Sequence, residues 1–225
     1  MPGAIALVGG DEFRSGCEEL DRAVLASVEA VRPRLLVLPT AAAHEGPAMA
    51  ASNGVRYFSE LGADAAPLMV LDRSDAEDEA LAAEVESADV VYLTGGNPSH
   101  LLDTLRGSLL LRSMADARER GAVLAGSSAG AMVMGAWMRF RGWREALGIT
   151  GSIAALPHHE RADPESVAAE LAADAPTGLT AVLGIDARTG CLATGDGWKV
   201  LGAGQVAVYQ GGAWRRSSSG ESFTL

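Results

Sequence analysis

The sequence is short of cations and of long apolar runs, and each shortage excludes a class of partner. Lysine and arginine together number 18 against 29 acidic residues, so the formal net charge is −11 at pH 7. Binding to nucleic acid or to an anionic membrane surface needs clustered cations, so we expect neither partner. No apolar stretch approaches the roughly 20 residues that cross a bilayer, so we expect no membrane-spanning helix.

Cysteine is also scarce, because the chain has only two, Cys17 and Cys191, far apart in the sequence. Their spacing is not that of a metal site, and we expect neither a metal nor another cofactor. A low cysteine content is typical of a reducing compartment. The opening residues lack the basic segment and long apolar run of a signal peptide, so the sequence predicts a cytoplasmic protein.

Short apolar runs alternate with helical patterns up to about residue 150. This alternation predicts an α/β fold of three layers, with a mostly parallel central sheet covered by helices on both faces. Later runs are short and separated by glycine-rich turns, which predicts C-terminal antiparallel hairpins. The length of 225 residues, without a linker or a repeat, predicts a single domain over residues 1–225. The predicted strands are 4–8, 35–38, 68–71, 90–93, 123–125, 182–185, 191–194, 199–201 and 205–209, and the predicted helices are 17–31, 53–61, 77–86, 101–120 and 129–138.

The strongest chemical signal surrounds Ser128, where a predicted buried strand runs directly into a predicted helix. The turn reads G-x-S-x-G, with Gly126 and Gly130 on either side of Ser128. This pattern is typical of a nucleophile elbow, in which a sharp turn projects the central serine hydroxyl above the sheet edge. The free N–H of Ala129 at the start of the helix can stabilise an oxyanion. Ser127 is the neighbouring alternative, but the glycine spacing selects Ser128.

A serine nucleophile needs a base, and the chain has four histidines. His158 and His159 follow an apolar run, 153–156, and a proline. A histidine at the carboxyl end of a strand lies where α/β proteins build their sites. His44 and His100 occupy a polar loop and a helix start, where exposure to solvent is the simpler interpretation.

The segment Gly95-Gly96-Asn97 ends the strand that precedes the elbow strand in the sequence. We expect this loop to lie beside Ser128. Glycine allows a backbone N–H to approach a substrate oxygen closely. Asn97 is a candidate substrate-binding residue of the same loop.

The segments Thr94-Gly95-Gly96-Asn97, Gly126-Ser127-Ser128-Ala129-Gly130-Ala131 and Leu156-Pro157-His158 resemble the dipeptidase E and cyanophycinase family of serine peptidases. The resemblance extends over most of the chain. It implies a fold like that of the class I glutamine amidotransferases, with serine in place of cysteine. It also implies hydrolysis of dipeptides with an N-terminal Asp, or of β-aspartyl-arginine units of a storage polymer, and it allows a homodimer.

The same resemblance assigns roles to individual residues. His158 would be the base, with His159 in the place of the family's aromatic residue. The backbone N–H groups of Gly96 and Ala129 would form the oxyanion hole. The family's third triad member is an acid shortly after the nucleophile, and Glu145 is the only acid between Ser128 and His158.

The acid remains open among three candidates, because the sequence around Glu145 matches the family poorly. Glu160 is one alternative, since His158-x-Glu160 reproduces the H-x-E spacing of the amidotransferases. Asp186 is the other.

Arginines at 139, 141, 144 and 161 cluster in sequence around the proposed base and acid. Arginine can bind a carboxylate with two parallel hydrogen bonds, and Arg161 is the first candidate for this contact. We therefore predict a serine hydrolase that acts on small peptides or isopeptides carrying an Asp-like carboxylate. The alternatives are a small esterase and a non-catalytic small-molecule binding or sensing protein with the same fold.

Overall fold

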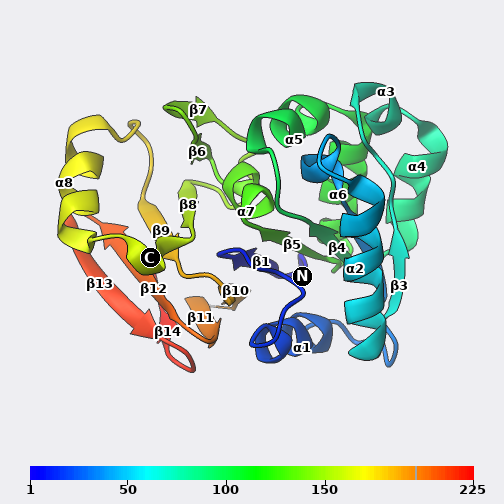
Figure 1. Ribbon diagram of the computed structural model, residues 1–225, viewed down its shortest axis with the longest axis horizontal. Helices are drawn as coiled ribbons and strands as arrows, with labels where there is room; N and C mark the ends of the chain where they lie inside the picture. Colours follow the sequence, from blue (N-terminus) through cyan, green and yellow to red (C-terminus); the bar gives the residue numbers. More distant parts are fainter. Residues whose placement is uncertain (196) are drawn as a thin grey trace.

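The computed structural model describes residues 1–195 and 197–225, and an eight-stranded sheet forms its centre (Figure 1). The strand order is β14-β11-β10-β1-β5-β4-β2-β3. The five strands from β1 to β3 in this order run parallel, and the three on the other side of β1 are antiparallel to their neighbours. Their bounds are β1 (Ile5–Val8), β2 (Arg34–Leu38), β3 (Asp64–Pro67), β4 (Val90–Leu93), β5 (Val123–Ser127), β10 (Thr189–Thr194), β11 (Gly197–Gly202) and β14 (Ser222–Phe223).

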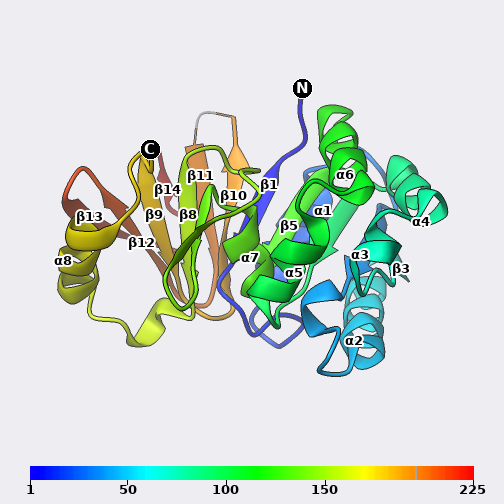
Figure 2. The same ribbon diagram turned by 90° about the horizontal axis from the view of Figure 1, so that it is seen from above.

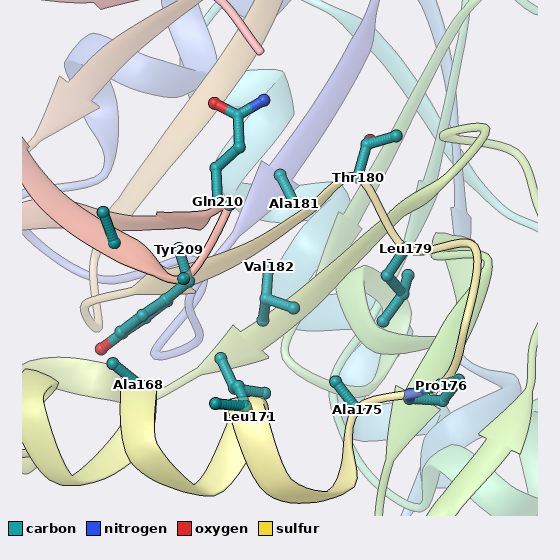
Figure 3. A pocket seen from close by; sticks show the side chains of 14 residues that line it. Ala168, Leu171, Ala175, Pro176, Leu179, Thr180, Ala181, Val182, Tyr209 and Gln210 are labelled. Carbon is teal, nitrogen blue, oxygen red and sulfur yellow. The ribbon is translucent and has the colours of Figure 1, made fainter.

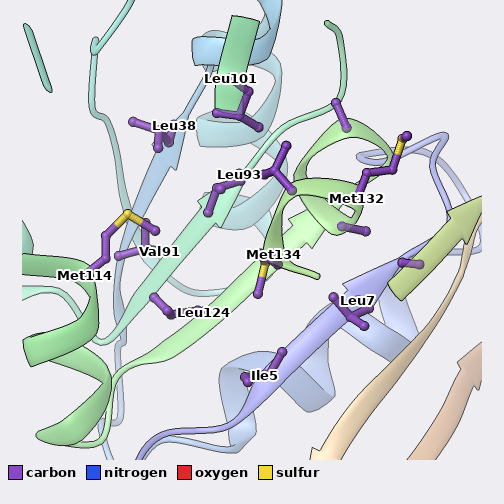
Figure 4. Close-up of a cluster of buried hydrophobic side chains, with 14 of the residues drawn as sticks. Ile5, Leu7, Leu38, Val91, Leu93, Leu101, Met114, Leu124, Met132 and Met134 are labelled. Carbon is purple, nitrogen blue, oxygen red and sulfur yellow. The ribbon is translucent and has the colours of Figure 1, made fainter. Parts of the chain in front are cut away.

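Helices cover both faces of this sheet, because the parallel strands other than the edge strand β3 are apolar on both sides. Successive strand residues point to opposite faces, so Ile5 and Leu7 of β1 belong to one core and Ala6 and Val8 to the other. The first core packs against α3 to α7, and the second packs against α1 and α2. Figure 4 shows part of the first core, with Leu101 of α5, Met114 of α6 and Met134 of α7 beside the strands. The helices are α1 (Glu18–Ala26), α2 (Pro47–Glu60), α3 (Arg73–Ala76), α4 (Glu79–Glu84), α5 (Pro98–Leu105), α6 (Leu109–Glu119) and α7 (Ala129–Met134).

A second sheet of four strands lies beside the β10–β11 side of the first (Figure 2). Its order is β13-β12-β9-β8, with β8 parallel to β9 and the other pairs antiparallel. Helix α8 (Pro164–Asp174) packs on this sheet, and a separate hairpin, β6 (Trp137–Arg139) and β7 (Trp143–Glu145), follows α7. The strands of the second sheet are β8 (Ile153–Pro157), β9 (Ala181–Ile185), β12 (Gln205–Gln210) and β13 (Ala213–Ser218).

The predicted fold class is confirmed: the sheet is mostly parallel, helices cover both faces, and antiparallel strands follow at the C-terminal end. The C-terminal strands are not simple consecutive hairpins, however. β9 pairs in parallel with β8 in the second sheet, whereas β10 and β11, which follow β9 in the sequence, belong to the eight-stranded sheet. The chain therefore alternates between two sheets after residue 181.

Local predictions fail where tertiary packing overrides the apolar pattern. The strand expected at 68–71 lies earlier, as β3, because this edge strand is partly exposed and carries no apolar run. The helix expected at 101–120 is two helices, since Gly107 adopts φ +67 and the Ser108 side chain caps α6. The hairpin β6–β7 and helix α8 were not predicted.

Candidate active site

Ser128 lies at a strained turn between β5 and α7. Its backbone has φ 49° and ψ −109°, and its N–H donates to the Val8 carbonyl at 2.9 Å. The two flanking glycines are required by space: a Cβ on Gly126 would lie 2.6 Å from the backbone of Gly130, and one on Gly130 would lie 2.5 Å from the Leu93 carbonyl. The helix therefore starts against β5 and its neighbour β4, and this is the geometry of a nucleophile elbow.

His158 directly follows β8, at the carboxyl end of a strand in the second sheet. Its backbone is left-handed (φ 54°, ψ 44°), and its N–H donates to the carbonyl of Gly9 at 2.8 Å. The imidazole Nε2 lies 3.2 Å from Ser128 Oγ. Ser128 therefore follows a strand of the first sheet, and His158 follows a strand of the second. Both donate backbone hydrogen bonds to the end of β1, Ser128 to Val8 and His158 to Gly9.

A cavity of about 480 Å³, here called the Ser128 cavity, opens beside this pair. Its volume is in the range of small-molecule sites. The charged side chains in its lining come from two segments, the loop after β1 and the region of α2. The lining consists of Asp11, Glu12, Phe13, Arg14, Glu45, Ala50, Asn53, Arg56, Gly95, Gly96, Ser128 and His158.

The loop of residues 94–97, here called the oxyanion loop, follows β4 next to β5. Gly96 has φ 138°, and a Cβ there would lie 2.3 Å from the Ala41 carbonyl, so only glycine fits. In the described part of the chain, the N–H groups of Gly96 and Ala129 donate to no other group. Both remain free to donate to an oxygen near Ser128.

Two predicted substrate-binding residues lie outside the lining of the Ser128 cavity. The Asn97 side-chain oxygen accepts from the N–H groups of Ser99 and His100, so it caps α5. Arg161 is exposed at the end of a short 3₁₀ helix. The cations that line the cavity are instead Arg14 and Arg56.

Sequence reasoning missed these two arginines and Glu12. Arg56 lies on the exposed side of α2, where nothing in the local pattern points to a site. The segment Asp11-Glu12-Phe13-Arg14 did carry a signal, because it follows the carboxyl end of a buried parallel strand. That position is where α/β sheets place their ligands.

The structure separates Glu145 from His158, contrary to the sequence prediction. Ala136 lies between the end of β7 and the start of β8: its N–H donates to the carbonyl of Ile153, and its carbonyl accepts from the N–H of Ala146. Glu145, which precedes Ala146, therefore lies near the start of β8. His158 follows the other end of β8, about 16 Å along the strand from Ile153 at the usual rise per residue. Among the described hydrogen bonds, none joins the two side chains, and the Glu145 carbonyl instead accepts from Arg106.

The other two candidate acids lie close to the histidine pair. The Glu160 carboxylate accepts from the Ala187 N–H at 2.9 Å. That hydrogen bond is the main reason why the pKa of Glu160 is lowered, and the charge of His158 contributes as well. The Asp186 carboxylate accepts from the Gln205 N–H at 2.9 Å and lines a cavity of about 200 Å³ with His159 and Glu160.

His159 is buried behind the base, away from the Ser128 cavity. Its Nε2 lies 2.7 Å from the hydroxyl of Tyr209, and the two rings meet edge to face. Burial lowers the pKa of His159, so the ring favours the neutral form. The structure therefore gives His159 a packing position and leaves His158 facing the nucleophile.

A further cavity, of about 140 Å³, lies between α8 and the second sheet (Figure 3). Its labelled side chains are mostly aliphatic, with Leu171 of α8 facing Val182 of β9. Tyr209 is the one titratable residue in its lining, and its hydroxyl already contacts His159. The one hydroxyl residue other than Tyr209 in this lining, Thr180, bonds to Ser152, and no base is among the described residues of the lining. Over residues 1–195 and 197–225 the structure shows no cluster of metal-ligating side chains and no helix long and apolar enough to cross a membrane.

The comparison with known families agrees with this geometry. Residues 5–199 match the model of peptidase family S51. The chain belongs to this family. It is therefore a serine-type peptidase with the dipeptidase E and cyanophycinase type of fold, as the sequence motifs predicted.

Similar proteins include cyanophycinases from two cyanobacteria. The chain is 28% identical to those of Trichormus variabilis and of Nostoc sp. over 222 residues, which cover 91% of this chain and 72% of each relative. A cyanophycinase of Geminocystis herdmanii is 29% identical over 134 residues, 59% of this chain and 48% of that protein.

Two solved structures resemble the fold. A peptidase from an acI-B1 actinobacterium superposes with a TM-score of 0.88 at 28% identity, covering 100% of this chain and 98% of the other. A putative peptidase E protein from Listeria monocytogenes superposes with a TM-score of 0.60 at 13% identity, covering 97% of this chain and 99% of the other. The second comparison supports the fold alone.

Proposed function

We propose that Ser128 and His158 hydrolyse a small peptide or isopeptide through an acyl-enzyme on Ser128. The observation that carries the proposal is the 3.2 Å contact between Ser128 Oγ and His158 Nε2 at the edge of the Ser128 cavity. His158 Nε2 takes the hydroxyl proton as Ser128 attacks the scissile carbonyl, and it then gives this proton to the leaving amine. A water molecule, activated by the same imidazole, cleaves the acyl-enzyme.

The N–H groups of Gly96 and Ala129 are the proposed donors to the tetrahedral oxyanion. They come from two neighbouring strands, so a carbonyl placed over Ser128 can meet both. Loss of one such donor typically costs about 100- to 1,000-fold in kcat. For Nε2 to act as the base, the neutral imidazole must carry its proton on Nδ1.

We further propose that Glu160, rather than Glu145, is the acid that acts on His158. The hydrogen bond from the Ala187 N–H lowers the pKa of this carboxyl and so favours its charged form. The described hydrogen bonds do not join it to the imidazole, so its effect is the electrostatic stabilisation of the imidazolium. Asp186 is engaged with the Gln205 N–H and faces His159 instead.

The lining of the Ser128 cavity supports a substrate that carries a carboxylate. Among the described residues, the guanidinium groups of Arg14 and Arg56 form no ion pair, although the acids of the cavity lie nearby. Arg56 donates to the Asn53 side-chain oxygen at 3.2 Å, and its other N–H groups and those of Arg14 can bind a substrate carboxylate through paired hydrogen bonds. We therefore propose Asp-containing dipeptides or β-aspartyl isopeptides as substrates, the second class because the similar cyanobacterial proteins are cyanophycinases.

A labelling and hydrolysis experiment tests this function. Purified protein is treated with a fluorophosphonate probe and then assayed on Asp-X, Asn-X and β-aspartyl-arginine dipeptides, beside Ser128→Ala. We expect labelling of wild type only and a preference of about tenfold or more for Asp over Asn, from a charged contact of about 1.5–3 kcal/mol. Arg56→Ala should remove most of this preference, whereas Arg161→Ala, outside the cavity, should retain it. Equal rates on the Asp and Asn substrates would refute the carboxylate proposal, and labelling of Ser128→Ala at the wild-type rate would refute the nucleophile.

A single domain over residues 1–225, a cytoplasmic location and a homodimer remain predictions. Cell fractionation and size-exclusion chromatography with light scattering test the last two. The net charge of −11 supports small peptides, rather than nucleic acid, as the partner.

A further inference from the structure

We propose that Glu12 is a positioning residue that fixes the oxyanion loop to the nucleophile strand β5. The proposal rests on the proposed function, because this loop contributes to catalysis only if Ser128 is the nucleophile. Glu12 lies in the loop after β1 and lines the Ser128 cavity. No described hydrogen bond connects it to Ser128 or His158, so its role must pass through other residues.

The two carboxylate oxygens of Glu12 bind two different parts of the site. One oxygen accepts from the backbone N–H of Gly95 at 2.7 Å, and the other accepts from the Ser127 hydroxyl at 2.8 Å. Gly95 directly precedes the proposed oxyanion donor Gly96, and Ser127 directly precedes the nucleophile. The Glu12 side chain therefore connects the residue that precedes the proposed oxyanion donor to the residue that precedes the proposed nucleophile.

These contacts determine where the Gly96 N–H points. The oxyanion loop is held on one side by Glu12 at Gly95 and on the other by the Asn97 N–H, which donates to the Ala41 carbonyl at 2.7 Å. Gly95 is also confined between Glu12 and the nucleophile, because a Cβ on it would lie 3.0 Å from Glu12 Oε1 and 3.3 Å from Ser128 Cβ. With both neighbours fixed, the Gly96 N–H keeps one orientation. Preorganised donors stabilise a developing oxyanion without having to reorganise during the reaction.

Glu12 is itself held by the residues on either side of it. Asp11 and Phe13 have φ of 56° and 63°, in the left-handed region that costs a non-glycine residue energy. The Phe13 ring packs within 5.7 Å, centroid to centroid, of the rings of Tyr57, Phe58 and Tyr92. This aromatic cluster anchors the loop and presents Glu12 to the two donors.

Three substitutions of Glu12 separate the effect of its two hydrogen bonds from the effect of its charge. In Glu12→Gln the amide oxygen can accept from Gly95 N–H, and the amide nitrogen can donate to the Ser127 hydroxyl, so both connections survive without the charge. In Glu12→Asp the charge survives, but the side chain is one methylene too short to reach both donors. Glu12→Ala removes both connections.

The test measures kcat, KM and the rate of fluorophosphonate labelling for these three variants. A role in positioning predicts that Gln retains kcat within about fivefold of wild type, while Asp and Ala lose about 30- to 300-fold in kcat and in labelling, comparable with the loss of one oxyanion donor. KM should change less than about threefold, because Glu12 does not bind the substrate. Glu18→Ala is the matched control, since Glu18 accepts from the Gly16 N–H at 2.7 Å in the same region but outside the Ser128 cavity. It should leave kcat unchanged.

Three outcomes would overturn the proposal. The first is a kcat of Glu12→Ala and Glu12→Asp within about threefold of wild type, the second is a raised KM with unchanged kcat, and the third is a Glu12→Gln variant as impaired as Glu12→Ala. The second outcome would make Glu12 a substrate-binding residue, and the third would make its charge the important property. If Glu12→Ala does not fold, as judged by its thermal melting, the comparison of Gln with Asp decides. Failure of the proposed function would look different, because wild type would then not be labelled at Ser128 at all.

Discussion

The imidazole of His158 lies directly against the backbone of Gly10. A Cβ at residue 10 would lie 2.2 Å from Cε1 of this ring and 2.3 Å from Nε2, the atom that faces Ser128. Gly10 follows β1 in the first sheet, whereas His158 follows β8 in the second. The absence of a side chain at residue 10 is therefore what allows the imidazole of His158, which follows the second sheet, to reach Ser128 of the first.

Replacing Gly10 with alanine should displace the base without unfolding the protein. We expect labelling of Ser128 by a fluorophosphonate to slow by about 100-fold, the cost of misplacing a catalytic group by about 1 Å. Gly121→Ala is the matched control, because Gly121 has nearly the same φ, 113° against 112°, but no atom within 4 Å of its added Cβ. Both variants carry the backbone strain, and only Gly10→Ala carries the clash. Equal labelling of the two variants would contradict this account.

The two neighbouring histidines should respond in opposite ways to substitution. His158→Gln should abolish labelling, since no other base contacts Ser128 Oγ among the described residues. His159→Phe should keep labelling, because phenylalanine preserves the ring that packs against Gly184 and edge-on to Tyr209. It should lower stability by about 1 kcal/mol, from the lost hydrogen bond to Tyr209. Urea denaturation measures the stability, and an inactive His159→Phe beside an active His158→Gln would reverse the assignment.

The candidate acids can be compared with two isosteric variants. Glu145→Gln should leave kcat within about twofold of wild type, because β7 lies at the opposite end of β8 from His158 and no described hydrogen bond joins the two side chains. Glu160→Gln should lower kcat by about three- to tenfold, since the amide oxygen can still accept from Ala187 N–H but no longer stabilises the imidazolium. The pH dependence of kcat/KM should shift only in the Glu160 variant. A larger loss in Glu145→Gln than in Glu160→Gln would restore the assignment based on sequence.

The fold and the turn that carries Ser128 were predictable from the sequence because their signals are local. Apolar strands that alternate with helices define the parallel sheet, and the glycines at 126 and 130 define the turn around Ser128. Both glycines prove necessary for close packing of α7 against β5 and β4. The carboxyl end of an apolar run marked the pair His158-His159, and the family resemblance then selected His158.

The remaining site residues were not predictable because their partners are distant in the sequence. Glu12 reaches Gly95 and Ser127 across 83 and 115 positions. Glu145 was chosen by its position between nucleophile and base, but the hairpin β6–β7 carries it to the start of β8. Arg161 was chosen by proximity to His158, whereas the arginines of the cavity come from the loop after β1 and from α2. Sequence proximity does not determine which side chains meet at the junction of two sheets.

The last prediction concerns Asp21, a buried acid of α1 that the proposed chemistry does not use. Its side chain is 1% exposed, and neither carboxylate oxygen has a hydrogen-bond partner among the described residues. Burial raises its pKa to about 7; the neighbouring Tyr57 hydroxyl opposes this shift, and the charges of Glu12 and Glu18 add to it. In the unfolded chain the same group titrates at about 3.9.

This difference fixes the sign of a pH effect on stability. Between about pH 4 and pH 7 the unfolded chain has released the proton while the folded chain still holds it, so the contribution of Asp21 to stability falls as the pH rises. Above about pH 7 both states are ionised, and the loss is complete. Asp21→Asn mimics the protonated side chain and should remove this dependence. We expect the variant to match wild type near pH 4 and to be more stable by about 2–4 kcal/mol at pH 8, which urea denaturation at both values measures. Glu19→Gln, on the exposed side of the same helix, is the control and should follow wild type at every pH. If Asp21→Asn keeps the pH slope of wild type between 4 and 7, the side chain is already ionised in the folded protein and the raised pKa is refuted.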